Sequence, residues 1–287
     1  MKSHGARIAR WAVAALGALA AVQELGARLY YRRTEPPVPR FVEDERTAWT
    51  PAWREALAPF EWLAASARSR TPAGVPRGVG DPVLLVPGFL MTSHYLAPLA
   101  RWLGALGYAA RAADVGWNAD CFDAVANDLL ADVRATHQRT GRRVHLVGHS
   151  LGGALARAAA VRAPDAIASV ATLGAPLRGL RLNPGLRAAA AVVRAGIHRR
   201  RDVPDACATF ACPCDTVRAL ATEPPPRVPL LTLATRDDGV ADWRYALDPL
   251  ATRTATVRGS HTGLVFNLAV YEALARHLAD ARARAAA

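Results

Sequence analysis

Short, continuous apolar runs alternate along this chain with longer segments whose apolar residues recur every three or four positions. Such runs stand at residues 83–86 (VLLV), 144–148 (VHLVG) and 229–234 (PLLTLA). A strand that is apolar at successive positions is buried on both faces, which is typical of parallel sheets. The segments at 95–106 and 122–133 have the spacing of amphipathic helices. The alternation therefore predicts an α/β fold, with a mainly parallel sheet and helices on both faces.

The chain has 287 residues, of which 52% are hydrophobic, and this is enough for one large domain with a substantial core. We expect that domain to occupy residues 81–287. Residues 35–80 begin with the stiff linker EPPVPR and continue into one or two short helices. Residues 177–227 interrupt the alternation over a length far beyond an ordinary connection. We expect a lid or substrate-binding cap there, with a purely structural insertion as the alternative.

The first 34 residues have the pattern of a signal or anchor segment. Basic residues at positions 2, 7 and 10 precede an apolar run from Trp11 to Val22, and ALA at residues 18–20 fits a cleavage site. The run is short for a bilayer span, and Gln23 and Glu24 interrupt its extension. We therefore expect an exported or membrane-tethered protein, with a cytoplasmic location as the alternative.

The formal net charge of +12 does not by itself indicate a nucleic-acid partner. The basic residues are arginines apart from Lys2, and they are scattered among alanines without a stripe of interleaved aromatic residues. We expect no nucleic-acid binding. The charge is compatible with attraction to an anionic membrane surface through the N-terminal segment.

Three of the four cysteines, Cys207, Cys212 and Cys214, lie in the motif CATFACPC, and the fourth is Cys121. Their spacing is not that of a paired zinc motif, and no histidine pair is near them. Export would permit a disulfide within this cluster or from it to Cys121. Free thiols in a surface insertion are an equal alternative.

Gly148, Ser150 and Gly152 form the pattern G-x-S-x-G in GHSLG, between a buried strand and a helix. That context is the one a nucleophile elbow requires. Small flanking residues permit a strained turn at the serine, and the helix N-terminus favours negative charge above it. Ser150 is therefore the candidate nucleophile.

A serine nucleophile needs a base, and the base needs an orienting carboxylate; in this type of fold the acid precedes the histidine along the chain. The strand PLLTLA is followed by TRDDGVADW, which offers Asp238 first, Asp237 as the fallback and Asp242 third. The strand ATVR is followed by GSHTG, which places His261 in a tight turn. His149 is the variable position of the elbow, and we expect it and the remaining histidines to be surface or packing residues.

Acyl transfer also needs donors for a tetrahedral oxyanion. The N–H of Leu151, next after the nucleophile, is one candidate. The second is the N–H of Phe89 in VPGFLMTSHY, where Gly88 permits a tight loop after an early strand. The alternative is that PGF is only a turn that ends the strand.

The motifs LLVPGF, GHSLGG, TLGAP, DDGVADW and RGSHTGL, taken in order, resemble the α/β-hydrolase fold and in particular bacterial lipases and carboxylesterases. The resemblance runs from Asp81 to the C-terminus, apart from the insertion. Many such lipases have His-Gly in the oxyanion loop, where this chain has Pro-Gly. The resemblance implies that neither a metal nor an organic cofactor takes part. The site it implies has a triad of Ser150, Asp238 and His261, with an oxyanion hole formed by Phe89 and Leu151.

The leading hypothesis is a serine ester hydrolase that cleaves lipophilic carboxylic esters through an acyl-enzyme on Ser150. Apolar residues at 89–91 and the N-terminal segment favour a small-molecule or lipid ester as its substrate. An acyltransferase or thioesterase with the same triad is one alternative. A catalytically silent, membrane-tethered binding protein is the other.

Overall fold

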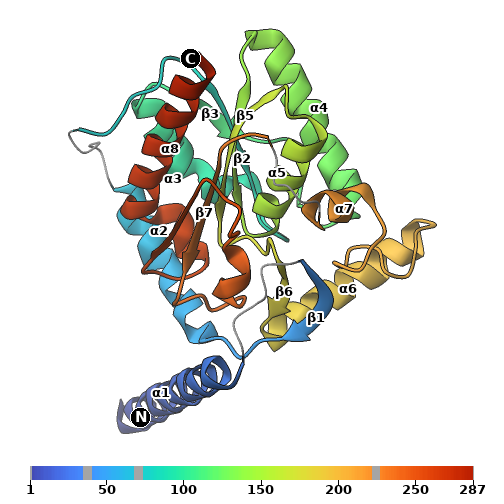
Figure 1. Cartoon of the computed structure of the whole chain (residues 1–287). Helices are drawn as coiled ribbons and strands as arrows, with labels where there is room; N and C mark the ends of the chain where they lie inside the picture. The colour runs from blue at the N-terminus through green and yellow to red at the C-terminus, as the bar shows by residue number, and fades with distance from the viewer. Residues whose placement is uncertain (1, 35–40, 68–73, 222–226, 287) are drawn as a thin grey trace.

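The computed structural model describes residues 2–34, 41–67, 74–221 and 227–286. Six strands form one sheet in the order β3–β2–β4–β5–β7–β8, and every neighbouring pair is parallel (Figure 1). This confirms the predicted α/β architecture. The strands are β2 (Pro82–Val86), β3 (Ala109–Ala112), β4 (Val144–His149), β5 (Ile167–Leu173), β7 (Leu230–Thr235) and β8 (Arg253–Val257).

Helices cover both faces of this sheet (Figure 1). One face carries α3 (Ala97–Ala105) and α8 (Leu268–Ala286), and the other carries α4 (Phe122–Thr140), α5 (Leu151–Arg162) and α7 (Asp215–Ala221). Successive side chains of a strand point to opposite faces. Accordingly, Val83 and Leu85 of β2 belong to the core with α3 and α8, whereas Leu84 and Val86 belong to the core with α4 and α5.

Short 3-10 helices precede two helices of the domain, α3 and α8. The helix expected at residues 95–106 is split into η2 (Ser93–Leu96) and α3, and Pro98 lies in the first turn of α3, where proline is well tolerated. The final helix likewise consists of η4 (Thr262–Phe266) and α8. A third 3-10 helix, η3 (Trp243–Ala246), follows β7.

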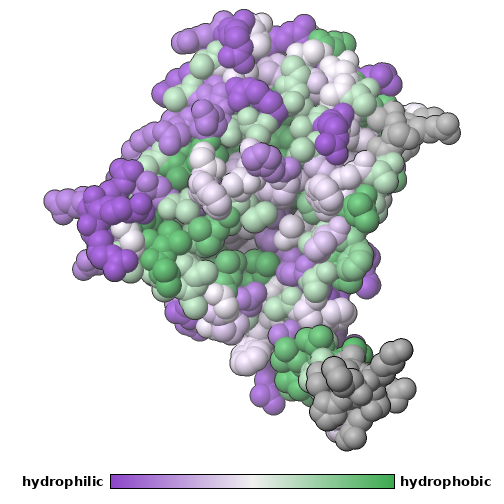
Figure 2. Space-filling view, turned by 180° about the vertical axis from the view of Figure 1, so that it is seen from behind, coloured by the Kyte–Doolittle hydropathy of each residue, from purple (hydrophilic) through white to green (hydrophobic). Residues whose placement is uncertain are grey.

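The N-terminal helix α1 (Lys2–Arg33) is continuous and projects from the body, with apolar side chains exposed to solvent (Figures 1 and 2). The polar residues after Val22 do not end the helix; they attach it to the domain. Gln23 Oε1 accepts a 3.0 Å hydrogen bond from the Trp53 N–H, and Glu24 accepts bonds of 3.1 and 3.2 Å from Arg54. Residues 11–33 are long and apolar enough to cross a membrane, by length and composition.

The segment between α1 and the sheet contains a strand that the sequence analysis missed. It comprises β1 (Val42–Thr47), η1 (Ala52–Leu57) and α2 (Ala58–Ser66); the linker EPPVPR lies outside the described residues. Four of the six residues of β1, VEDERT, are charged, and the strand gives no hydrophobic strand signal. It is a strand because it pairs in parallel with β6 (Gly179–Leu182) of the insertion, forming a separate two-stranded sheet.

The insertion continues from β6 into α6 (Pro184–Arg200), which begins where the Asn183 side chain accepts a 2.9 Å hydrogen bond from the Leu186 N–H. All four cysteine thiols are free. The structure therefore has the free-thiol alternative and not the disulfide, with Cys207 and Cys212 buried and Cys121 and Cys214 partly buried.

Candidate active site

Ser150 lies in the turn between β4 and α5, at the carboxyl edge of the sheet. Its backbone has φ +52° and ψ −129°, a strained conformation for a residue with a side chain. Glycine is required on both sides. A Cβ at Gly148 would lie 2.4 Å from the Gly152 carbonyl oxygen, and one at Gly152 would lie 2.3 Å from the Pro87 carbonyl oxygen. Close packing of β4, α5 and the loop after β2 therefore holds Ser150 in this strained turn.

His261 and Asp238 meet from the loops that follow β8 and β7. His261 Nδ1 lies 2.6 Å from Asp238 Oδ2, and both residues are buried. The other carboxylate oxygen, Oδ1, accepts hydrogen bonds of 2.8 Å from the N–H groups of Val240 and Ala241. Because a carboxylate can only accept, Nδ1 carries the proton, and Nε2 of the neutral ring has a free lone pair. This is the tautomer that a general base needs.

The environment of His261 also favours the protonated ring. Burial acts to lower the pKa of His261, because it disfavours a charge. The negative charge of Asp238 and its hydrogen bond, followed by the charge of Glu55, outweigh burial and raise this pKa above its ordinary value. The site can thus stabilise the imidazolium that forms when His261 takes a proton.

The two other carboxylates that the sequence left open have different partners. Asp237 forms ion pairs with Arg54 and with Arg258, whose Nε lies 2.7 Å from Asp237 Oδ2. Asp242 accepts hydrogen bonds from the Tyr30 hydroxyl at 3.0 Å and from Arg244 Nε at 2.9 Å. Of the three, Asp238 is the one that contacts the His261 ring in the described residues.

Gly174 lies between His261 and the pocket at Ser150 and packs closely against the His261 ring. A Cβ at Gly174 would lie 3.1 Å from the His261 ring, and Gly174 lines the same pocket as Ser150. Within the part of the chain that the structure describes, the Ser150 hydroxyl makes no hydrogen bond. Contacts between a nucleophile and its base are often loose and tighten when substrate binds.

A buried chain of hydrogen bonds that the sequence did not reveal connects three loops of the site. His149 Nε2 lies 3.1 Å from the His261 carbonyl oxygen, which can only accept, so Nε2 carries the proton. Burial, and next the nearby His261, lower the pKa of His149 to about 3, and its ring is therefore neutral. Nδ1 accepts from the Tyr95 hydroxyl 3.0 Å away, which in turn accepts the Gly88 N–H at 2.8 Å. His149 is thus a packing residue that ties the elbow to both neighbouring loops.

The loop after β2 and the first residue of α5 supply two candidate N–H donors to an oxyanion beside Ser150. Asn118 Nδ2 fixes this loop through a 2.7 Å hydrogen bond to the Pro87 carbonyl oxygen. The N–H groups of Phe89 and Leu151 donate no hydrogen bond to any other described residue. Both residues line the same pocket as Ser150, so their amides are available to an oxyanion.

An apolar pocket opens at Ser150 beneath the insertion. Helix α6 contributes Leu186, Ala190 and Val193, whose spacing places them on one face of the helix. Asp120 and Arg194 are the charged residues in the lining. The other apolar residues of the lining are Phe89, Phe122, Leu151, Pro176, Leu180, Leu182, Ala208, Phe210 and Ala241.

Comparisons with known proteins find matches to part of the chain. Residues 81–204 match the family model described as the alpha/beta hydrolase fold. A triacylglycerol lipase from Burkholderia plantarii is 32% identical over 143 residues, covering 45% of this chain and 39% of that protein. Another, from Pseudarthrobacter phenanthrenivorans, is 35% identical over 109 residues, covering 34% of each chain. The chain thus spans between a third and two fifths of the length of these curated relatives.

Solved structures agree in the chain fold. The mature form of Bacillus licheniformis lipase BlEst2 has a TM-score of 0.53 at 20% identity, covering 72% of this chain and 96% of that one. A soluble variant of monoglyceride lipase from Saccharomyces cerevisiae also has a TM-score of 0.53, at 16% identity, covering 74% of this chain and 94% of that one. At these identities the likeness is one of fold.

Proposed function

We propose that this chain, which has the α/β-hydrolase fold, is a serine hydrolase of lipophilic carboxylic esters. The observation that carries the proposal is the buried hydrogen bond of 2.6 Å between His261 and Asp238, formed at the sheet edge where Ser150 stands in a strained turn. A carboxylate buried against a histidine, beside a serine at a helix N-terminus, is the arrangement that activates a hydroxyl for acyl transfer.

In the proposed reaction, Ser150 Oγ attacks the acyl carbonyl carbon while His261 Nε2 takes the hydroxyl proton. Asp238 holds the ring and stabilises its positive charge. The amides of Phe89 and Leu151 bind the oxyanion. His261 then gives the proton to the leaving alcohol, and water releases the acyl group from Ser150 by the same steps.

The pocket supports a lipophilic acyl group as the substrate portion held near Ser150. Its lining is almost entirely apolar, and burial of hydrocarbon in such a pocket is favourable by about 0.8 kcal/mol per CH₂. Since α6 forms one wall, we propose that residues 177–227 act as a substrate-binding cap.

Hydrolysis of p-nitrophenyl esters of graded chain length tests this function. We expect turnover and a preference for medium or long acyl chains. Ala190→Phe should fill the pocket and lower kcat/KM for a long-chain ester at least about tenfold relative to the acetate ester, as lost methylene contacts do elsewhere. Ala188→Phe is the matched control, because Ala188 is exposed on the same helix. Absence of turnover on every ester would contradict the proposal.

We also propose that α1 tethers the domain to a bilayer surface. Among the described side chains of α1, hydrogen bonds to the body begin at Gln23, and residues 11–22 are almost all exposed, so they form the free apolar part of the helix. At a rise of about 1.5 Å per residue this part is roughly 18 Å long, less than the ~30 Å hydrocarbon core of a bilayer. While α1 stays docked, it therefore reaches into one leaflet and does not span both.

Flotation with vesicles that contain phosphatidylglycerol tests this tether. The full chain should float with the vesicles, and a chain lacking residues 1–22 should remain in the dense fraction while retaining its activity on soluble esters. Equal flotation of both chains would mean that α1 is not the membrane contact.

A further inference from the structure

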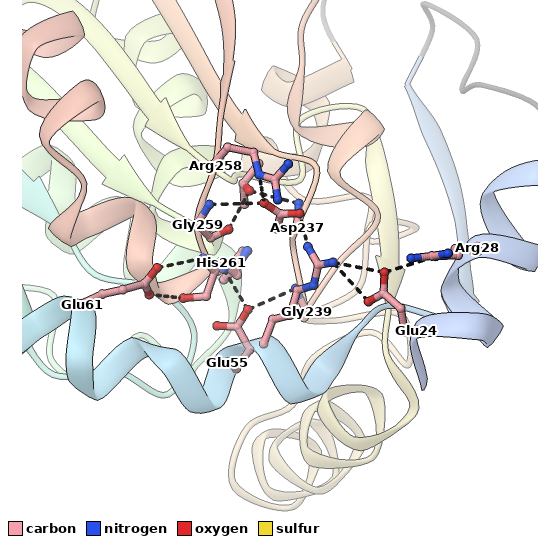
Figure 3. Close-up of polar contacts among 12 residues, drawn as sticks. Glu24, Arg28, Glu55, Glu61, Asp237, Gly239, Arg258, Gly259 and His261 are labelled. Carbon is pink, nitrogen blue, oxygen red and sulfur yellow. Dashed lines mark hydrogen bonds and ion pairs between the residues drawn. The ribbon is translucent and has the colours of Figure 1, made fainter. Parts of the chain in front are cut away.

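Glu55, in η1 of the N-terminal segment, binds the backbone of both loops that carry the acid and the base (Figure 3). Its Oε1 accepts hydrogen bonds from the His261 N–H at 2.8 Å and the Gly239 N–H at 3.1 Å. Its Oε2 accepts from the Thr262 N–H at 3.0 Å. One carboxylate thus joins the residue after Asp238 to His261 itself.

The approach of Glu55 to these loops is close enough to depend on glycine. A Cβ at Gly239 would lie 2.8 Å from Glu55 Oε1 and 3.1 Å from the Pro51 carbonyl oxygen. In the described part of the chain the Glu55 carboxylate forms no ion pair. The neighbouring Arg54 is instead paired with Glu24 and Asp237. The charge of Glu55 therefore acts on the two loops without a cation beside it.

We infer that Glu55 is a positioning residue for the proposed hydrolase: it fixes the loops of Asp238 and His261 relative to each other and places a second negative charge near the base. This inference rests on the proposed function, because it assigns Glu55 a role only through His261. Three hydrogen bonds to a charged acceptor are a strong restraint on two loops that share no strand.

The charge has a second, separable effect. The groups that face His261 are Asp238 from the loop after β7, Glu55 from η1 and neutral His149 from the end of β4. Asp238 and Glu55 both raise the pKa of His261 against the opposing effect of burial. His261 must be neutral to act as a base, so kcat/KM should rise as pH increases through this pKa. Removal of the Glu55 charge lowers the pKa and moves that acid limb to lower pH.

Glu61 provides an internal comparison. It binds the same histidine loop from α2, accepting from the Ser260 hydroxyl at 2.5 Å and the Ser260 N–H at 3.2 Å. It contributes hydrogen bonds to the loop as Glu55 does, but it is not among the groups that shift the pKa of His261. A loss of loop support alone is therefore expected from Glu61→Gln.

The test compares pH profiles of kcat/KM for p-nitrophenyl butyrate in the full-length protein. In Glu55→Gln the amide oxygen can keep the bonds to His261 and Gly239, whereas the NH₂ group opposes the Thr262 N–H. We expect kcat/KM to fall about tenfold and the acid limb to move to lower pH. Glu61→Gln should lose rate with its acid limb unmoved. Glu272→Gln, on the outer face of α8, should match the wild type in both respects.

Glu55→Asp covers the case in which Glu55→Gln does not fold. It keeps the charge on a shorter side chain, so kcat/KM should fall while the acid limb stays at the wild-type pH. The inference is overturned by an unmoved acid limb in Glu55→Gln, by an equal shift in Glu61→Gln, or by full activity of Glu55→Asp. A wild-type protein without esterase activity or fluorophosphonate labelling would instead refute the proposed function.

Discussion

Replacing Ser150 with alanine should reduce kcat for ester turnover at least about ten-thousandfold. The hydroxyl is the atom that forms the acyl-enzyme, and no other group in the proposed site can take its place. The pocket and the two backbone amides persist in the variant, so residual hydrolysis and nearly unchanged substrate binding are expected. Alanine retains a Cβ in the strained turn at φ +52°, and the fold should therefore survive the change.

Covalent labelling with a fluorophosphonate tests directly whether Ser150 is the nucleophile. The wild type and Ser93→Ala, which loses an exposed hydroxyl on η2, should both be labelled. Ser150→Ala should not be. Labelling of Ser150→Ala to the wild-type level would show that another residue is the nucleophile, and thermal unfolding of all three proteins checks that they are folded.

Replacing Asp238 with asparagine should reduce kcat about ten-thousandfold, although the side chain keeps its shape. The reason is the direction of its hydrogen bonds. Oδ1 is fixed by the N–H groups of Val240 and Ala241, so the asparagine oxygen must remain there and its NH₂ must face His261. The His261 Nδ1 would then have to accept, and Nε2 would carry the proton. A ring in that tautomer cannot take the proton of Ser150.

Asp237→Asn is the matched control for this prediction. It removes the same charge one residue earlier, but it breaks the pairs with Arg54 and Arg258 and leaves the Asp238–His261 bond intact. We expect a loss of less than about tenfold, since charged pairs near the surface contribute little. A larger loss in Asp237→Asn than in Asp238→Asn would reverse the assignment of the acid.

The sequence was sufficient for the features that depend on local pattern. Buried parallel strands require runs of apolar residues, and the elbow requires glycines around Ser150. The sheet and the turn can therefore be predicted from the sequence. The choice among Asp237, Asp238 and Asp242 was ranked but stayed open, because three carboxylates within six residues differ only in the directions that the folded loop gives them.

The contacts that support the site could not be predicted from the sequence, for a different reason. His149 was placed in the elbow, yet its bonds to Tyr95 and to the His261 backbone join residues far apart in the sequence. Glu55 lies in a segment whose aromatic residues indicate only packing, and nothing periodic marks its carboxylate as an acceptor for distant amides. The pairing of β1 could not be predicted for the same reason, because its partner β6 is a short strand far away in the sequence.

The pairing of β1 with β6 has a practical consequence for production of the protein. A shortened version that starts at Asp81, where the family match begins, would remove the partner of β6 and the Glu55 carboxylate together. It would retain Ser150, Asp238 and His261, but it would lack the strand that pairs with β6 of the insertion and the carboxylate that binds the two loops. The smallest complete unit therefore extends upstream of the recognisable domain. An apolar N-terminal segment that hinders expression is best removed by a cut after residue 22, which keeps the bonds of Gln23, Glu24 and Tyr30 to the domain.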